Sequence, residues 1–387
     1  MTSDRDNPPS PAGRRPLLLH VFPSYGAGGV PIRIANIINA LGDRYSHLVF
    51  ALDGNMDAAS RLDPALGVAV EDPGIDKARP LAALLKIHRT IAARRPDLML
   101  TYNWGAVEWA LVNRFGARRP HIHFESGFGP EESDRQIPRR VWMRRLALGG
   151  TPAIVVPSQT LMGIATGIWR IGPRRLRHVP NGVDCDLFGG PGDAAILPGY
   201  GRREGEVVVG TLAPLRPEKN IARLLRAFAA AAEGRAVRLL VVGDGAERPV
   251  LERTAAALGI ADRVLFAGHV ERPDLAYPLF DIFGISSDTE QMPNTVIQAM
   301  AASLPVAGTD VGDVKANLSP QNAPFIVPRD DEAALAEALR RLIDDAALRR
   351  DLAAANRRHV LAHYGMDRMI EAYRALFDGA LARSGGG

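Results

Sequence analysis

Residues 286–301 read SSDTEQMPNTVIQAMA and follow Asp281-Ile-Phe-Gly-Ile285, a mostly apolar run. Such a run is typical of a buried strand. Pro293 suits the first turn of a helix, because that position needs no backbone N–H. The sequence therefore predicts a strand, a short polar loop and a helix.

The loop and the helix start carry the groups suited to a sugar nucleotide. Glu290 is expected in the loop after the strand, and Gln298 lies eight positions later on the helix. The amides of Asn294, Thr295 and Val296 are expected to point out of the helix N-terminus. A helix start has unpaired N–H donors and partial positive charge, so it suits a phosphate or sugar hydroxyls.

Strands alternate with helices along the rest of the chain, which is typical of parallel sheets covered on both faces. In the first half, strands are predicted at 16–22, 47–52, 97–102, 121–124 and 153–157, and helices at 30–41, 81–94 and 138–148. In the second half, strands are predicted at 207–212, 238–243, 264–268 and 306–310, and helices at 220–232, 248–258, 332–344 and 366–376.

A glycine-rich loop, Pro23-Ser-Tyr-Gly-Ala-Gly-Gly-Val-Pro31, joins the first strand to the first helix. Gly28 and Gly29 allow the backbone to approach a phosphate closely. One alternative is a nicotinamide-binding loop of the G-x-G-x-x-G type, with Asp53 as the ribose-binding acid. Gly26 and Gly28 fill only two of its three places, since residue 31 is proline. Another alternative is a tight turn without a ligand.

Two cations stand three residues apart where a strand end meets a helix start. Arg216 and Lys219 lie in Gly210-Thr-Leu-Ala-Pro-Leu-Arg-Pro-Glu-Lys-Asn220. A diphosphate leaving group gains negative charge as its bond to a sugar breaks, and fixed cations stabilise that charge without a metal. Ordinary surface charges are the competing interpretation.

These motifs together resemble the retaining family 4 glycosyltransferases. That family has a Glu, seven residues and a second Glu, followed by Ala-Met-Ala-x-x-x-Pro-Val, which here is 299–306. The resemblance implies that Glu290 faces the transferred sugar and that Gln298 takes the place of the ribose-binding acid. As a neutral acceptor, Gln298 is expected to hold the ribose less strongly than a carboxylate.

The resemblance also implies roles for other residues and a fold. Gly28 and Gly29 would lie near the donor diphosphate, Arg216 and Lys219 would bind it, and backbone groups near Gly243 would contact the base. The implied architecture is α/β, with two Rossmann-like domains facing a central cleft, the GT-B fold. The expected parts are a disordered tail at 1–15, an acceptor-side domain at 16–182, a linker at 183–205, a nucleotide-sugar domain at 206–364 and a helix at 365–383 that crosses back to the first domain.

A histidine at the end of a predicted strand is a further candidate. His123 closes the strand at 121–124 and precedes the glycine-bearing loop that starts at Glu125. A buried histidine with satisfied hydrogen bonds is the competing interpretation. Some family members place a histidine, and some an acid, near this point to contact the sugar or the acceptor. His123 is ranked slightly above Glu125 as a catalytic candidate. Further acceptor-side candidates are Asn103, Trp104 and Glu108.

Nothing in the sequence favours a metal or an organic cofactor. Asp184-Cys-Asp186 belongs to a turn-and-cap sequence, and no pair of histidines has zinc spacing. The single cysteine, Cys185, excludes an internal disulfide and fits a reducing compartment. The first 15 residues lack the apolar core of a signal peptide. We therefore expect a cytoplasmic protein without a metal site.

The charge is uneven along the chain. The net charge of +4 combines +7 for residues 1–187 with −3 for the remainder, and residues 135–177 hold nine arginines and no acid. The helix predicted at 138–148 mixes arginine with Val, Trp, Met and Leu, which suits anionic lipid headgroups at the inner face of the membrane. A solvated basic face is the alternative. Nucleic acid is not expected, since no reading motif accompanies the charge.

The function predicted from these features is transfer of a sugar from a nucleoside diphosphate sugar to a glycan or a lipid-linked acceptor. Surface polysaccharide or glycolipid synthesis is the expected setting. Two alternatives stay open: a nucleotide-sugar-binding protein with weak catalysis, which Gln298 brings into consideration, and a sugar-nucleotide epimerase on the same fold.

Overall fold

The computed structural model describes residues 14–128, 130–132 and 135–383. The tail predicted for residues 1–15 lies outside this part of the chain, except for Arg14 and Arg15. These two arginines pair with Asp97 and Asp43 at 2.8 and 2.9 Å. The remainder of that prediction is untested.

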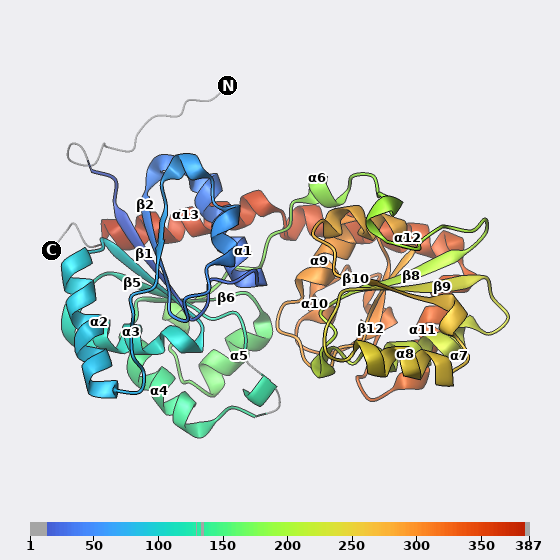
Figure 1. Cartoon of the computed structure of the whole chain (residues 1–387), viewed down its shortest axis with the longest axis horizontal. Helices are drawn as coiled ribbons and strands as arrows, with labels where there is room; N and C mark the ends of the chain where they lie inside the picture. The colour runs from blue at the N-terminus through green and yellow to red at the C-terminus, as the bar shows by residue number, and fades with distance from the viewer. Residues whose placement is uncertain (1–13, 129, 133–134, 384–387) are drawn as a thin grey trace. The chain divides into compact units, whose positions relative to one another are not determined.

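The chain divides into two compact units (Figure 1). The first unit consists of Met1–Glu125, Trp142–Ile154 and Tyr373–Gly387. The second consists of Ser126–Val141 and Val155–Ala372. The predicted linker at 183–205 falls inside the second unit, where it contains the short helix α6 (Cys185–Phe188).

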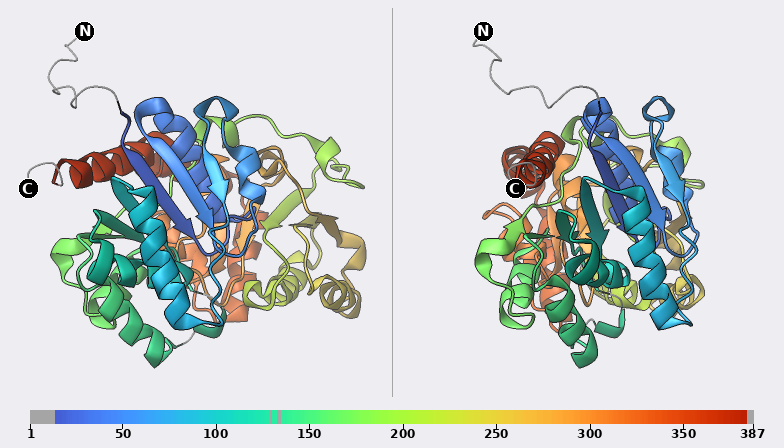
Figure 2. Two further views of the ribbon diagram at one scale, coloured as in Figure 1. Left: turned by 60° about the vertical axis from the view of Figure 1, so that its left-hand side comes forward. Right: turned by 90° about the vertical axis from the view of Figure 1, so that its left-hand side faces the viewer.

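The N-terminal sheet has seven strands in the order β3-β2-β1-β4-β5-β6-β7. Their bounds are β1 Leu17–Phe22, β2 Ser46–Ala51, β3 Ala69–Glu71, β4 Leu98–Tyr102, β5 His121–Phe124, β6 Ala153–Val156 and β7 Leu176–His178. The pairs from β3 through β5 are parallel. Strand order reverses between β1 and β4, the point at which doubly wound folds bind ligands. Figure 2 shows β1 and β2 side by side.

Helices cover this sheet because alternate residues of a strand face opposite sides. The helices are α1 Gly29–Leu41, α2 Pro80–Arg94, α3 Val107–Val112, α4 Pro138–Leu148 and α5 Gln159–Gly167. Leu19 and Val21 of β1 pack with Ile87 and Ile91 of α2 and with Trp109 of α3 in one core.

The C-terminal sheet has six strands in the order β10-β9-β8-β11-β12-β13. Their bounds are β8 Val207–Leu212, β9 Val237–Val242, β10 Val264–Gly268, β11 Ile282–Ile285, β12 Val306–Thr309 and β13 Ile326–Val327. The pairs are parallel, and the order reverses between β8 and β11. This sheet repeats the doubly wound plan.

Two apolar clusters lie on opposite faces of the second sheet. Val209 of β8 faces α7, α8 and α11, whereas its neighbour Val208 faces the cluster that contains α9 and α12. The helices are α7 Ile221–Ala232, α8 Arg248–Ala257, α9 Asn294–Ala301, α10 Val314–Asn317, α11 Glu332–Asp344 and α12 Ala346–His363. The predicted α/β class with two Rossmann-like domains is confirmed.

The last helix, α13 (Met366–Ala382), has contacts in both units. In the second unit, Sδ of Met369 accepts from the backbone N–H of Gly182 at 3.1 Å. In the first unit, the ring of Tyr373 stacks on Phe124 with centroids 5.1 Å apart, and Asp378 pairs with Arg44 at 2.7 Å. The helix ends at Ala382, beyond the 366–376 predicted from periodicity and within the 365–383 implied by the resemblance.

Several parts of the element prediction need correction. α12 was not predicted, because its apolar positions are sparse between arginines. The helices α3, α5, α6 and α10 and the two- and three-residue strands β3, β7 and β13 were missed because they are short. Pro293 is the N-cap of α9, with φ −72° and ψ 112°, so the helix starts one residue later than expected.

Candidate active site

Hydrogen bonds of buried hydroxyl groups anchor the loop that carries Glu290. Ser286 and Ser287 follow β11 and are 1% and 2% exposed. The Ser286 hydroxyl donates to the backbone oxygen of Asn220 at 3.0 Å, and Thr309 of β12 donates to the Ser287 carbonyl at 2.7 Å. The residues directly after β11 are therefore fixed to neighbouring segments, which positions the loop that contains Glu290.

Glu290 pairs with Lys219 although 70 residues separate them in the chain. The Lys219 Nζ lies 2.5 Å from Glu290 Oε1, and the Ser287 hydroxyl donates to the same oxygen at 2.7 Å. The Glu290 side chain is only 11% exposed and that of Lys219 22%. An ion pair this sheltered from water holds both groups in defined positions.

A small cavity of about 40 Å³ opens beside this pair. Its walls come from the carboxyl ends of β8 and β11, the two strands at which the order reverses. Lys219, Glu290 and Thr295 are the predicted site residues that line it. The sheet topology therefore brings a cation, an acid and the first turn of α9 to the edge where a doubly wound sheet binds ligands.

A second ion pair supports the lysine loop, and we did not predict it. Arg223 Nη1 of α7 lies 2.8 Å from Asp288 and 2.9 Å from the Ser286 carbonyl. Asn220 caps α7 in the left-handed region at φ 42° and donates to Asp288 at 3.1 Å. This network fixes the residue next to Lys219. The sequence does not indicate this role of Arg223, because its position is typical of an ordinary polar residue on an amphipathic helix.

Gly243 brings a second loop against the cavity wall. Its φ is +131°, and a Cβ there would lie 1.9 Å from the Ala213 carbonyl oxygen. Ala213 lines the cavity, whereas Gly243 does not. Glycine is required because no side chain fits between the two loops.

Arg216 lies apart from the other predicted cation. Its side chain is 67% exposed, its Nη1 is 4.0 Å from Glu218, and it is not among the described residues that line the cavity. The predicted pair of cations is thus split in this structure, with Lys219 inside and Arg216 at the surface.

One of the three backbone amides expected to be free for a ligand at the start of α9 is already hydrogen-bonded. The Val296 N–H donates to the Pro293 carbonyl at 3.2 Å, so this amide already has a partner. The Asn294 side chain accepts from Asn181 Nδ2 at 2.8 Å. Thr295 faces the cavity.

Gln298 is oriented by a tyrosine. The buried Tyr277 hydroxyl donates to Gln298 Oε1 at 3.0 Å, and burial raises the pKa of Tyr277 well above its ordinary value. Tyr277 therefore stays a hydrogen-bond donor. It occupies one lone pair of the amide oxygen and leaves the second for another donor.

His123 and the glycine loop belong to the first unit. Gly28 is the N-cap of α1, which starts at Gly29, and its N–H donates to the Gly26 carbonyl at 2.7 Å. His123 is fully buried, and its Nδ1 lies 2.8 Å from the Thr101 hydroxyl. These positions leave the predicted ligand contacts of the three residues untested.

A buried charged cluster surrounds His123. Its Nε2 lies 3.9 Å from Glu125, and Glu125 lies 3.6 Å from Arg144 of α4; all three side chains are 0% exposed. The Arg144 guanidinium also packs 4.9 Å from the ring centre of Trp104. Neither oxygen of Glu125 has a hydrogen-bond partner among the described residues.

The buried cluster corrects one expectation about the basic helix. Arg144 was counted with the surface arginines of residues 135–177, but it points inward from the same face of α4 as Val141 and Leu148. Arg140 pairs with Glu131 and Glu132 at 2.6 and 3.0 Å. The side chains that α4 exposes include Arg139, Trp142 and Leu146.

Several aspartates cap helices or turns. Asp184 caps α6 by accepting from the Leu187 N–H at 2.9 Å, and Asp331 and Asp345 cap α11 and α12. Asp53 accepts from the Asn55 N–H at 2.9 Å, as in a local turn. Within the described residues, no group of three His, Cys, Asp or Glu side chains could hold a metal ion.

Two family models match the chain. A model described as Glycosyltransferase Family 4 matches residues 27–187, and one described as Glycosyl transferases group 1 matches residues 206–345. Together they match more than half of the chain.

Curated relatives carry glycosyltransferase names. The D-inositol 3-phosphate glycosyltransferase of Salinispora arenicola is 28% identical over 331 residues, 79% of this chain and 73% of that protein. The lipopolysaccharide core biosynthesis glycosyltransferase LpsD of Rhizobium meliloti is 30% identical over 209 residues, 54% of this chain and 56% of that protein.

Solved structures share the fold. Anabaena Alr3699/HepE in complex with UDP superposes with a TM-score of 0.78 at 18% identity, covering 94% of this chain and 99% of that one. Sucrose-phosphate synthase from Thermosynechococcus elongatus gives a TM-score of 0.75 at 21% identity, covering 94% and 100%. With both family models and the fold in agreement, the chain belongs to the family 4 glycosyltransferases of the GT-B fold.

Proposed function

We propose that the chain is a retaining glycosyltransferase that moves a sugar from a nucleoside diphosphate sugar to a hydroxyl of a glycan or lipid-linked acceptor, without a metal ion. The observation that carries the proposal is the sheltered Lys219–Glu290 pair beside the cavity at the reversal point of the second sheet. Family membership supports the same reaction class.

Lys219 can serve the donor diphosphate while it keeps Glu290 in place. An ammonium group has three N–H donors, and Glu290 uses one of them at 2.5 Å. A second can reach a phosphate oxygen, where it stabilises the negative charge that grows as the leaving group departs. Arg216 would add a further cation if its exposed side chain turned toward the bound diphosphate.

The chemical step needs no side chain to act as base. The bond between the anomeric carbon and the phosphate oxygen breaks, and its electron pair stays on the diphosphate. The acceptor hydroxyl attacks the same face of the sugar, and its proton moves to the departing phosphate oxygen. Glu290 would orient the sugar ring and stabilise positive charge at the anomeric carbon.

The relatives suggest which substrates to test first. HepE was solved with UDP and with UDP-glucose, so uridine nucleotides are the first donor class to try. LpsD is named for lipopolysaccharide core biosynthesis and another relative for inositol 3-phosphate. Surface glycans and glycolipids are therefore the acceptor class that we propose, with a polyol phosphate as the soluble comparison.

We also propose that α4 contacts an anionic membrane surface at the inner face. Trp142 is 68% exposed and Leu146 49%, and Arg139 lies on the same side of the helix. An aromatic ring, an aliphatic side chain and cations on one side suit the lipid headgroup region. Among the described residues, no helix combines the length and the apolarity needed to cross a bilayer.

The decisive experiment combines nucleotide binding with transfer by two variants. A panel of nucleoside diphosphates is screened for a rise in melting temperature, which a ligand of the folded state must produce. With the nucleotide so found, Glu290→Ala should lower the transfer rate about 100-fold or more and leave nucleotide affinity largely intact. Lys219→Ala should lower both.

Matched controls remove the same charge types elsewhere in the unit. Glu337→Ala and Lys315→Ala remove exposed ion-paired side chains and should leave both readouts unchanged. Full activity of Glu290→Ala would remove that residue from the mechanism. Binding without acceptor-stimulated nucleotide release would identify a nucleotide-sugar-binding protein, and free sugar appearing together with nucleotide in the absence of any acceptor would favour an epimerase.

A further inference from the structure

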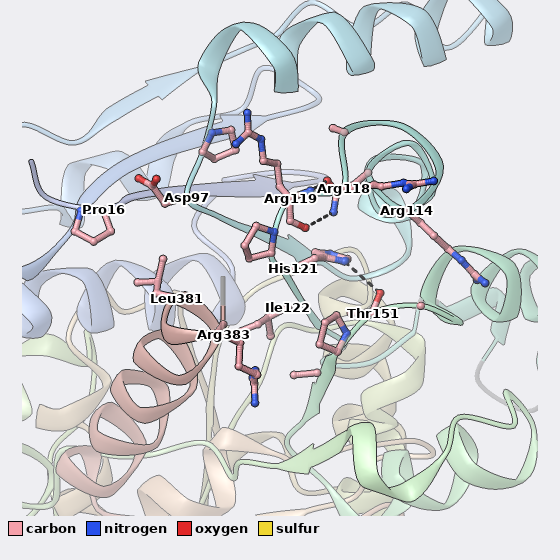
Figure 3. Close-up of a pocket in the computed structure, with 18 of the residues that line it drawn as sticks. Pro16, Asp97, Arg114, Arg118, Arg119, His121, Ile122, Thr151, Leu381 and Arg383 are labelled. Carbon is pink, nitrogen blue, oxygen red and sulfur yellow. Dashed lines mark hydrogen bonds between the residues drawn. The ribbon is translucent and has the colours of Figure 1, made fainter. Parts of the chain in front are cut away.

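A cavity of the first unit lies at the edge of the sheet away from the strand carboxyl ends. It measures about 1060 Å³, and residues at the starts of three strands line it: Asp97 before β4, Pro120 and His121 at β5, and Ala153 at β6 (Figure 3). The end of α13 contributes Leu381, and Arg383 directly follows that helix. Gly28 and Glu125 follow the opposite ends of β1 and β5, so this cavity is separate from the predicted ligand-binding edge.

The cavity is strongly cationic. The arginines that line it are Arg14, Arg114, Arg118, Arg119 and Arg383, and Asp97 is the carboxylate among the lining residues. Both oxygens of Asp97 accept from Arg14 at 2.8 Å, so this acid neutralises one guanidinium only. Within the described part of the chain, the guanidinium groups of Arg118, Arg119 and Arg383 have no ion-pair partner.

The buried side chain and the carbonyl of Asn113 fix the backbone at two of these arginines, Arg118 and Arg119. Asn113 is 3% exposed; its Nδ2 donates to the Arg119 carbonyl at 2.9 Å, and its Oδ1 accepts from the Arg119 N–H at 2.8 Å. Its own carbonyl accepts from the Arg118 N–H at 2.7 Å, which holds Arg118 in the left-handed region at φ 50°. The wall that presents both cations is therefore rigid.

The floor of the cavity adds neutral polar groups. His121 Nδ1 lies 3.2 Å from the Thr151 hydroxyl, and its Nε2 lies 2.8 Å from the Thr101 hydroxyl. Burial, together with the nearby His123, lowers the pKa of His121 to about 3. The histidine is thus uncharged near neutral pH, and the positive charge of the cavity comes from arginine alone.

From this arrangement we infer a second binding site, for a small molecule that carries more than one phosphate group. Guanidinium groups bind phosphate oxygens with paired N–H donors, and the volume suits a ligand of nucleotide size. Figure 3 shows Arg119 and Arg383 on different walls with His121 between them. A ligand that reaches both needs separated anionic groups, and it would tie the end of α13 to the start of β5.

Phosphate groups can come from a soluble metabolite or from a lipid headgroup, and two probes distinguish these sources. Tripolyphosphate is titrated calorimetrically into the Lys219→Ala protein at 150 mM salt, so that the donor site contributes little. Cosedimentation with vesicles of phosphatidylglycerol and phosphatidylcholine, against phosphatidylcholine alone, tests the headgroup. Both probes are applied with and without Arg118→Gln plus Arg119→Gln.

The double variant should weaken tripolyphosphate binding by about tenfold or more. The matched control, Arg350→Gln plus Arg358→Gln, removes two exposed arginines from α12 and should leave the affinity unchanged. Loss of vesicle binding alone would identify the headgroup as the source. The inference is overturned if neither probe binds, if the cavity variant binds like its parent, or if the control loses as much affinity. An unchanged melting temperature of the variant shows that it is folded.

Discussion

At the scale of single residues, the site depends on pairs that are distant in sequence. Lys219 and Glu290 were each predicted from local motifs, but their 2.5 Å contact depends on β8 and β11 lying side by side. Gln298 was predicted as a ribose contact, whereas its tyrosine partner was not. A residue's type can be read from the chain, but its partner depends on which strands become neighbours.

Replacing Gly243 with alanine should destabilise the second unit. The new Cβ would lie 1.9 Å from the Ala213 carbonyl, and the backbone cannot relax at φ +131°. We expect a loss of about 2 kcal/mol or more in the free energy of unfolding, together with weaker nucleotide binding. Urea denaturation and calorimetry measure the two effects.

Gly259 provides the matched control. It also has a positive φ, +69°, but a Cβ there would meet nothing within 4 Å. Gly259→Ala should therefore cost only about 1 kcal/mol, the strain of the left-handed backbone alone. Equal losses for the two variants would show that the contact with Ala213 is unimportant.

Gln298→Glu should tighten nucleotide binding. A charged acceptor makes roughly twice as strong a hydrogen bond as a neutral one, so we expect the dissociation constant of the nucleoside diphosphate to fall about three- to tenfold. Gln321→Glu, an exposed change of the same charge, should leave it unchanged. An unaltered constant for Gln298→Glu would place residue 298 away from the nucleotide.

At the scale of elements, capping and buried polar side chains hold the second unit together. Asn322 donates to the Val306 carbonyl and accepts from its N–H, at 2.7 and 2.9 Å, so it pairs with β12 as another strand would. Asn356 of α12 donates to Asn322 at 2.7 Å. The helix that periodicity failed to predict is thus joined to the sheet by hydrogen bonds as well as by apolar contacts.

Removing the cap of α12 should lower stability without affecting the site. Asp345 accepts from the Leu348 N–H at 2.8 Å. Asp345→Ala leaves this N–H without its side-chain partner and should cost about 1 kcal/mol, measured by urea denaturation. Asp345→Asn keeps the acceptor and should behave nearly like the parent. If both variants lose the same amount, the charge rather than the hydrogen bond is responsible.

At the scale of the whole molecule, three buried histidines of the first unit make stability depend on pH. Burial lowers the pKa of His47 to about 4 and that of His121 to about 3. Burial and the neighbouring His47 also lower the pKa of His20, whose Nε2 lies 2.9 Å from His47 Nδ1. Above the ordinary value of about 6.5, all three are neutral whether the chain is folded or unfolded.

Acidification should therefore weaken the first unit before its carboxylates titrate. Below pH 6.5 these histidines become protonated in the unfolded chain but stay neutral in the folded protein. The free energy of unfolding therefore falls by up to about 1.4 kcal/mol per pH unit for each histidine. Denaturation at pH 7.5, 6.5 and 5.5 measures this slope. His47→Gln removes one titrating group and should make it shallower; a flat profile for the parent would contradict the assignment.

Much of the architecture could be predicted because its causes are local. Runs of four to six residues typical of buried strands mark β5, β8 and β10 at their observed bounds, and Asp184 was recognised as a cap from its turn sequence. Residues at strand ends and helix starts, such as Glu290 and Lys219, follow from the same local order. Periodicity and capping depend on residues a few positions apart, so they can be predicted from the sequence alone.

Other properties arise only when distant segments meet. Arg144 has the same chemistry as Arg139, yet one is buried against Glu125 and the other is exposed, because α4 turns one face inward. The arginine-lined cavity joins residues from both ends of the described chain. Burial and electrostatic contact depend on distances in space, and the packing of helices on the sheets sets those distances.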